Sequence, residues 1–260
     1  MCLILLALNS YPDYPLVVAA NRDEFFSRAT AAANFWQETP YVLAGRDLSA
    51  GGTWIGITRQ GRFAALTNFR EPDKNKSDAP TRGKLVSDFL GGSIPASDYL
   101  DALSPRKSTF NGFNLLCGTL GEGIWHLSNR AERAAPLRLA AGIHGISNHL
   151  MDTPWPKVAQ GKSELAKALA ALPQDRRLFE LLRDDLIHDD AQLPRTGVSL
   201  EWERVLSAAF VRAPNYGTRS STVVLVGQQQ MVSFDEQTWL PSAVAAERRR
   251  FHFKLEGVGS

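Results

Sequence analysis

Met1-Cys2-Leu3-Ile4-Leu5-Leu6-Ala7-Leu8 opens the chain with an apolar run whose second residue is a cysteine. Residues 2–9 and 16–20 are two short apolar runs joined by a proline-containing turn, which predicts a hairpin of buried strands. Methionine is generally removed when the next side chain is small, so Cys2 would then carry both a thiol and a free α-amine. Such an amine has a pKa of about 7.7–8.0 and can activate a neighbouring nucleophile. The alternative is a buried structural cysteine in a first strand.

Length and composition favour an ordinary globular protein, and we expect one domain over residues 1–260 because no composition break suggests a boundary. The net charge of +2, from 29 basic and 27 acidic residues, gives no electrostatic case for a nucleic-acid or membrane-surface partner. No segment approaches the ~20 apolar residues of a membrane span. With only Cys2 and Cys117 no disulfide framework is implied, and a cytoplasmic location is expected.

The order of strand-like and helix-like segments predicts an α+β fold. Further strands are expected at 53–58, 62–67, 113–119, 123–127, 221–226, 231–234 and 251–254, and helices at 81–90, 95–103, 162–172, 177–186 and around residue 202. We expect two mixed sheets packed face to face, with Cys2 at the end of a central strand. The helices of residues 156–210 should cover one side.

Several common chemistries have no motif in this chain. There is no phosphate-binding loop, no G-x-S-x-G turn and no C-x-x-C-H haem attachment sequence. The five histidines have no metal-ligand spacing. We therefore expect neither a cofactor nor a metal, and the predicted partner is a small-molecule substrate or ligand. The sequence gives no indication of an oligomeric state.

Polar residues gather where four apolar runs begin or end. These clusters are Asn21-Arg22-Asp23-Glu24, Thr67-Asn68-Phe69-Arg70, Ser147-Asn148-His149 and Tyr216-Gly217-Thr218-Arg219-Ser220-Ser221. Acyl transfer needs donors aimed at an oxyanion, which asparagine side chains and backbone N–H groups can supply. An arginine and an acid beside the thiol can orient the amine and stabilise a thiolate. Each cluster alone is also compatible with ordinary turn chemistry.

The same blocks, with Met1-Cys2, Gly51-Gly52-Thr53-Trp54-Ile55-Gly56 and Phe113-Asn114-Leu115-Leu116, resemble the NRDE family, also called the transport and Golgi organisation family. The resemblance runs from residue 1 to about residue 226. This family in turn resembles the N-terminal nucleophile hydrolases, closest in pattern to the choloylglycine and penicillin V acylase group. That resemblance implies a four-layer αββα sandwich, two sheets face to face between helical layers.

Carried over by position, the resemblance implies that Cys2 is the nucleophile and its α-amine the base. Arg22 and Asp23 would hold the amine and thiol, and Arg219 would face the thiol. Asn148, after Ser147, and Asn68 would be the oxyanion donors. In the acylases the arginine and the acid are separated, whereas Arg22 and Asp23 are adjacent here, so either Asp23 or Glu24 could be the acid.

The leading hypothesis is a cysteine hydrolase of a linear or cyclic amide in a small molecule, acting only if Met1 is removed. Two alternatives remain: a non-enzymatic carrier of haem or lipid that uses the same pocket, as the eukaryotic family members imply, and a degenerate hydrolase fold kept as a binding module. Cys117 lies inside an apolar strand, where burial should raise the pKa of its thiol and block access. Cys2 is therefore the expected reactive cysteine.

Overall fold

The computed structural model describes residues 2–133 and 135–257, so Met1, on whose removal the proposed mechanism depends, lies outside the described residues. The strands are β1 (Cys2–Tyr11), β2 (Tyr14–Phe25), β3 (Thr30–Phe35), β4 (Val42–Asp47), β5 (Ile55–Thr58), β6 (Phe63–Asn68), β7 (Phe113–Thr119), β8 (Gly123–Ser128), β9 (Leu137–Arg138), β10 (Gly142–Ile146), β11 (Tyr216–Val226), β12 (Met231–Leu240) and β13 (Val244–Lys254). The α-helices are α1 (Gly83–Gly91), α2 (Ala96–Leu103), α3 (Pro156–Leu169), α4 (Arg176–Leu182) and α5 (Leu200–Val205).

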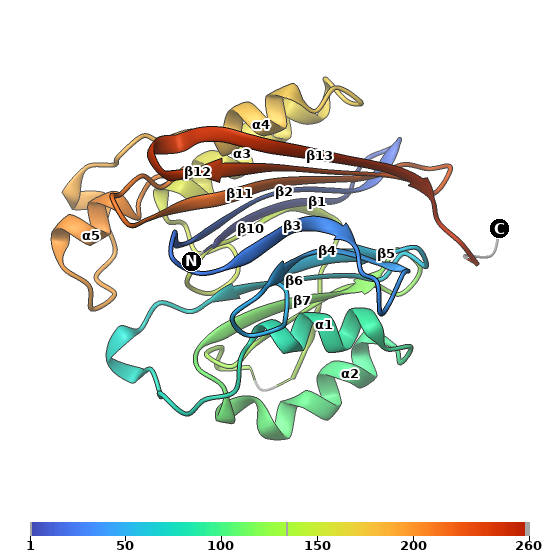
Figure 1. The fold of residues 1–260 in the computed structure, drawn as a ribbon, viewed down its shortest axis with the longest axis horizontal. Coiled ribbons are helices and arrows are strands. Elements are labelled where there is room, and N and C mark those ends of the chain that lie inside the picture. The colour runs from blue at the N-terminus through green and yellow to red at the C-terminus, as the bar shows by residue number, and fades with distance from the viewer. Residues whose placement is uncertain (1, 134, 258–260) are drawn as a thin grey trace.

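Two sheets face each other between two layers of helices, as Figure 1 shows. Within the described residues one sheet has six strands in the order β10-β1-β2-β11-β12-β13, and the other has seven in the order β3 to β9. Helices α3 and α4 cover the outer face of the first sheet, and α1 and α2 cover the outer face of the second. The four-layer αββα sandwich expected from the resemblance is therefore confirmed.

Strand β1 is apolar on both faces because both faces are covered. Its even-numbered residues from Cys2 to Leu8 point into the core between the two sheets, where they meet residues such as Ile55 and Phe234. Its odd-numbered residues Leu3, Leu5 and Ala7 point toward α3 and α4. A Cβ atom at Gly161 of α3 would lie 2.7 Å from Leu5, so glycine allows this close approach of helix to strand.

Several details of the sequence-based prediction were wrong. The sheets are not mixed, because every strand pairing in the described part of the chain is antiparallel. Strands β3 and β4 were not predicted, since the alanine-rich stretch 30–35 has low strand propensity and depends on its neighbours in the sheet. The helix expected after a cap at Thr81 begins at Gly83, and the helices expected at 162–172 and 177–186 span Pro156–Leu169 and Arg176–Leu182. No helix of the described residues is long and apolar enough to cross a membrane.

Candidate active site

Cys2 begins β1, beside the polar end of β2. Its backbone pairs with Arg22, and Arg22 pairs on its other side with Ser220 of β11. The side chain of Cys2 is 7% exposed and lines a cavity of about 530 Å³. Burial raises the pKa of the Cys2 thiol to about 11, so a nearby base is needed before it can act as a nucleophile at neutral pH.

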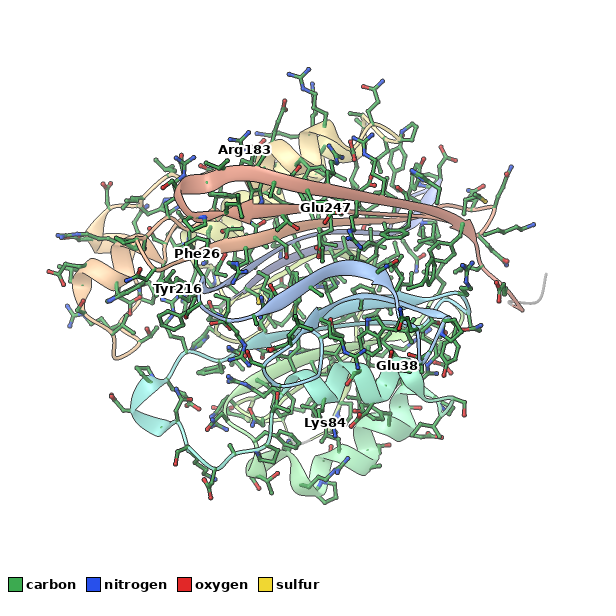
Figure 2. The ribbon with its side chains drawn as sticks, in the orientation of Figure 1. Phe26, Glu38, Lys84, Arg183, Tyr216 and Glu247 are labelled. Atoms are coloured by element: carbon green, nitrogen blue, oxygen red, sulfur yellow. The ribbon has the colours of Figure 1, made fainter. Side chains whose placement is uncertain are left out.

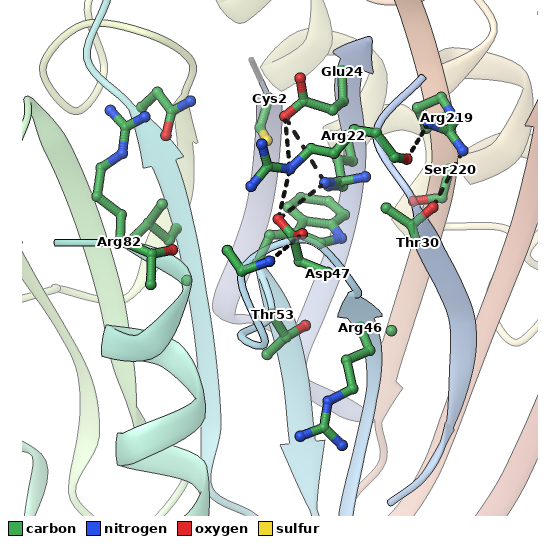
Figure 3. Close-up of a pocket in the computed structure, with 18 of the residues that line it drawn as sticks. Cys2, Arg22, Glu24, Thr30, Arg46, Asp47, Thr53, Arg82, Arg219 and Ser220 are labelled. Carbon is green, nitrogen blue, oxygen red and sulfur yellow. Dashed lines mark hydrogen bonds and ion pairs between the residues drawn. The ribbon is translucent and has the colours of Figure 1, made fainter. Parts of the chain in front are cut away.

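Arg22 and Glu24 face this cavity, as Figure 3 shows. The Arg22 guanidinium lies 3.9 Å from the Glu24 carboxylate and 3.8 Å from that of Asp47 on β4. Arg28 donates to Asp47 at 2.7 Å and lies 3.8 Å from Glu24. Two arginines and two carboxylates thus balance each other beside the thiol.

Asn21 and Asp23 point the other way, into the layer under the helices. The Asn21 amide donates to the backbone oxygens of Leu182 and Ala209 at 2.7 and 2.8 Å. The Asp23 carboxylate accepts a hydrogen bond from the Thr218 hydroxyl at 2.8 Å, and its side chain is 1% exposed. Burial raises the pKa of the Asp23 carboxyl group, and the nearby Lys157 charge opposes that rise.

Further ionisable groups lie in this buried layer. Arg70 forms an ion pair with Glu203 of α5 at 2.8 Å, and both side chains are only 4% exposed. Lys157 of α3 donates to the backbone oxygen of Leu206 at 2.9 Å, and burial lowers its pKa to about 8. Figure 2 shows the same end of the sandwich, where Tyr216, whose hydroxyl donates to the Asp23 backbone oxygen, lies near Phe26.

Asn68 and Asn148 are in direct contact, but only Asn68 lines the cavity. The Asn148 side chain is fully buried and donates to the backbone oxygen of Asn68 at 2.9 Å. Its oxygen accepts from Arg70 at 3.4 Å and from Ser147 at 3.3 Å. The Ser147 hydroxyl also lies 3.0 Å from the carbonyl oxygen of Cys2, so this pair is tied to the nucleophile through its backbone.

Arg219 lines the cavity, with its donors directed at the turn after β2. Its guanidinium donates to the backbone oxygens of Phe25 and Arg28 at 2.9 and 3.0 Å and to the Thr30 hydroxyl at 3.2 Å. These bonds fix the turn that leads from the polar end of β2 into β3. The turn places Arg28 next to Asp47, so Arg219 helps to shape this side of the cavity.

The structure therefore brings the side chains of four of the six predicted residues to one cavity: Cys2, Arg22, Asn68 and Arg219. Asp23 lies at the same wall, but its carboxylate points away from the cavity, toward Thr218. Asn148 lies behind Asn68. Sequence reasoning missed Arg28 and Asp47 because it missed the strands beside them. It also missed Arg70, Lys157 and Glu203, although Arg70 stands in one of the polar clusters. Within residues 2–133 and 135–257 no group of three histidine, cysteine or acidic side chains is placed to hold a metal ion.

Comparison with known families gives a match to the family model described as "Transport and Golgi organisation 2" over residues 1–241. The chain belongs to the Transport and Golgi organisation 2 family. The bovine (Bos taurus) Transport and Golgi organization protein 2 homolog is 39% identical over 263 residues, which cover 93% of this chain and 94% of that protein. The human (Homo sapiens) homolog is 36% identical over 278 residues, covering 98% of this chain and 100% of that protein.

Among solved structures, the Caenorhabditis elegans ortholog of N-acylethanolamine-hydrolyzing acid amidase has a similar fold. The TM-score is 0.53 at 12% sequence identity, over 86% of this chain and 92% of that one. At that identity the likeness concerns the fold. This chain therefore shares the overall fold of that amidase, in agreement with the four-layer αββα sandwich expected from the sequence.

Proposed function

We propose that this protein is a cysteine hydrolase that cleaves an amide bond of a small molecule after Met1 has been removed. The observation that carries the proposal is the position of Cys2. It begins β1, which lies between β10 and β2 in the six-stranded sheet, and its thiol lines a cavity of about 530 Å³ among charged side chains. A cavity of that size is in the range of small-molecule sites.

In the proposed reaction the Cys2 α-amine takes the thiol proton, and the sulfur attacks the amide carbon. The tetrahedral intermediate collapses when the amine returns that proton to the leaving nitrogen, which departs as an amine and leaves a thioester on Cys2. Water then attacks the thioester with the same amine as base, and the acid product is released with the thiol restored. A base next to the thiol can take its proton during the attack, although burial has raised the pKa of the thiol.

Asp23 is the better candidate for the acid that holds the amine, and Glu24 is the weaker one. The Glu24 carboxylate faces the cavity and lies beside Arg22 and Arg28, which occupy it as counter-ions. The Asp23 carboxylate is buried next to β1 and is fixed by Thr218. The positive charges of Lys157 and Arg70 near Asp23 would disfavour protonation of an amine held there, and so keep it available as a base.

For the oxyanion we propose Asn68 as the donor that reaches the cavity and Asn148 as the residue that positions it. The hydrogen bond from Asn148 to the Asn68 backbone oxygen supports this division. The carrier alternative finds less support in the cavity lining. Pockets for lipid or haem are mainly apolar, whereas this one is lined by five arginines and four acidic residues within the described part of the chain.

The test begins with intact-protein mass spectrometry of the natively expressed chain, which shows whether Met1 is removed. The protein is then incubated with a panel of N-acyl amines, N-acyl amino acids and cyclic amides, and released amine is measured. Hydrolysis should be lost in Cys2→Ala and kept in Cys117→Ala, the matched control, because Cys117 is fully buried behind the other sheet. A trapped acyl group should add its mass to the Cys2 peptide.

Retention of Met1 on the native protein would exclude the α-amine of Cys2 as the base. Hydrolysis unchanged in Cys2→Ala would exclude Cys2 as the nucleophile. Ligand binding that persists in Cys2→Ala without any turnover in the wild type would instead support a carrier or binding module.

A further inference from the structure

Five arginines of the described residues line the cavity, and four of them are occupied by the protein itself. Arg22 and Arg28 are paired with Glu24 and Asp47, and Arg46 is paired with Glu38. Arg219 is held by the backbone oxygens and the hydroxyl of the turn after β2. The fifth is Arg82.

The Arg82 guanidinium has no carboxylate within 4.0 Å among residues 2–133 and 135–257. Its one hydrogen bond in that part of the chain goes from Nη1 to the backbone oxygen of Gly112 at 2.9 Å. A guanidinium carries five N–H donors, so four are left without a protein acceptor there. Burial lowers the pKa of Arg82, yet an arginine keeps its positive charge throughout the physiological range.

Close packing at the start of α1 fixes this arginine in place. Arg82 is the residue directly before α1, and the Thr53 backbone N–H donates to the Gly83 backbone oxygen at 3.2 Å. A Cβ atom at Gly52 would lie 2.4 Å from the Gly83 backbone. Glycine at position 52 therefore lets the loop before β5 press against the helix start, so the base of the Arg82 side chain is anchored at the cavity wall.

Cys2 lies across the cavity from Arg82. Figure 3 shows the Arg82 side chain extending from the start of α1 on the side opposite Arg22 and Glu24. Cys2 is the charge partner that most opposes the fall in the Arg82 pKa, which indicates that the two groups are close enough to interact electrostatically. A molecule that reaches the thiol therefore passes within range of an uncompensated cation.

We propose that Arg82 binds an anionic oxygen group, a carboxylate or a phosphate, on the small molecule that occupies the cavity beside Cys2. The inference rests on the proposed function and narrows its substrates to amides that carry such a group near the scissile bond. A guanidinium suits either anion because its N–H groups form a planar fork that can make two parallel hydrogen bonds. The charges of Arg22, Arg28 and Arg46 are already balanced by carboxylates, whereas that of Arg82 is not.

The test measures protection of the Cys2 thiol from iodoacetamide, a neutral reagent, and does not require turnover. Labelling of the full-length protein is followed by peptide mapping in the presence of N-acetylglycine, N-acetyl-O-phosphoethanolamine or the neutral N-acetylglycinamide. One or both anions should slow labelling, and the neutral amide should not. The anion that protects at the lower concentration identifies the group that Arg82 recognises.

In Arg82→Gln, whose amide can still donate to the Gly112 oxygen, the protecting anion should be needed at about ten- to a hundredfold higher concentration, the loss expected for a hydrogen bond to a charged group. Arg46→Gln is the matched control, since Arg46 lines the same cavity but is paired with Glu38, and protection should be unchanged. Protection is expressed relative to each variant's own labelling rate without ligand.

Protection by N-acetylglycinamide as strong as that by either anion would overturn the proposal, and so would protection by the anions that is the same in Arg82→Gln and wild type. If Arg82→Gln does not fold, as judged by circular dichroism, Arg82→Lys replaces it and should still weaken protection because the fork is lost. Absence of amide hydrolysis with intact, Arg82-dependent protection would reject the hydrolase and leave this anion site standing.

Discussion

The two faces of the segment Asn21–Glu24 have different surroundings although the residues are consecutive. Asn21 and Asp23 lie under the helices, where their side chains are almost completely buried and hydrogen-bonded to fixed groups. Arg22 and Glu24 lie on the cavity side, where they form longer ion pairs and their side chains are 11% and 22% exposed. Because strand side chains alternate between faces, one short motif supplies both a buried support and a charged cavity wall.

This difference predicts that substitutions on the helix face mainly affect stability, whereas those on the cavity face mainly affect the chemistry of Cys2. A buried polar group that loses its partner is costly to leave unsatisfied. An ion pair near solvent contributes little to folding, yet its charge still acts on a titratable neighbour.

The largest expected effect is on the helix side, at the ion pair between Arg70 and Glu203. Arg70→Met leaves the buried Glu203 carboxylate without its counter-ion, so the free energy of unfolding should fall by about 3–5 kcal/mol. Arg28→Met is the matched control, because Arg28 binds Asp47 at 2.7 Å but is 35% exposed. It should lose less than about 1 kcal/mol. Urea unfolding measures both, and equal losses would contradict the comparison.

Asn21→Ala should be the next most damaging change. It removes the donor to two buried backbone oxygens and the acceptor of the Ser221 hydroxyl, which lies 2.6 Å away. We expect a loss of about 3 kcal/mol, since each unsatisfied buried group costs about 1–3 kcal/mol and some of them will find water. In Asn34→Ala, at an exposed position of β3, urea unfolding should show a change within about 0.5 kcal/mol. A loss below 1 kcal/mol in Asn21→Ala would mean that the helix face is less rigid than described.

The sequence predicted the contacts made by strand pairing better than those made by the packing of loops and helices. The hairpin of residues 2–20 predicts that Cys2 lies near Arg22, because a short turn brings the start of one strand to the end of the next. The polar cluster around Arg219 was also expected there, since late strands had to join early ones. Arg82, Lys157 and Glu203 could not be placed, because loop and helix packing decides their position. Because side chains alternate along β2, the sequence also implied that Arg22 and Asp23 face opposite sides of the sheet, but this was not predicted.

Lys157 should give the helix face a pH dependence. Its pKa is about 8 in the folded protein and about 10.5 when unfolded, so between these values the unfolded chain binds more protons. Stability contributed through Lys157 therefore rises with pH over this window, by at most about 1.4 kcal/mol per pH unit. The free energy of unfolding of the wild type minus that of Lys157→Met should therefore increase from pH 8 to pH 10. Lys167→Met, at an exposed site on the same helix, should show no such trend.

The smallest effect on stability is expected on the cavity face, where the readout is the thiol. Burial chiefly raises the Cys2 pKa; the Glu24 charge adds to that rise and the Arg22 charge opposes it. At pH 8, Glu24→Gln should therefore lower the Cys2 pKa and speed alkylation by iodoacetamide, whereas Arg22→Gln should slow it, each by about two- to fivefold for charges partly screened by solvent.

Both variants should keep the free energy of unfolding within about 1 kcal/mol of wild type, because the ion pairs they break are long, at 3.8–3.9 Å, and line the cavity. Opposite changes in rate at unchanged stability are the signature of electrostatic control. If both substitutions change the alkylation rate in the same direction, access to the thiol and not its charge environment is what Arg22 and Glu24 determine. The cavity face would then resemble the helix face, where packing decides the outcome.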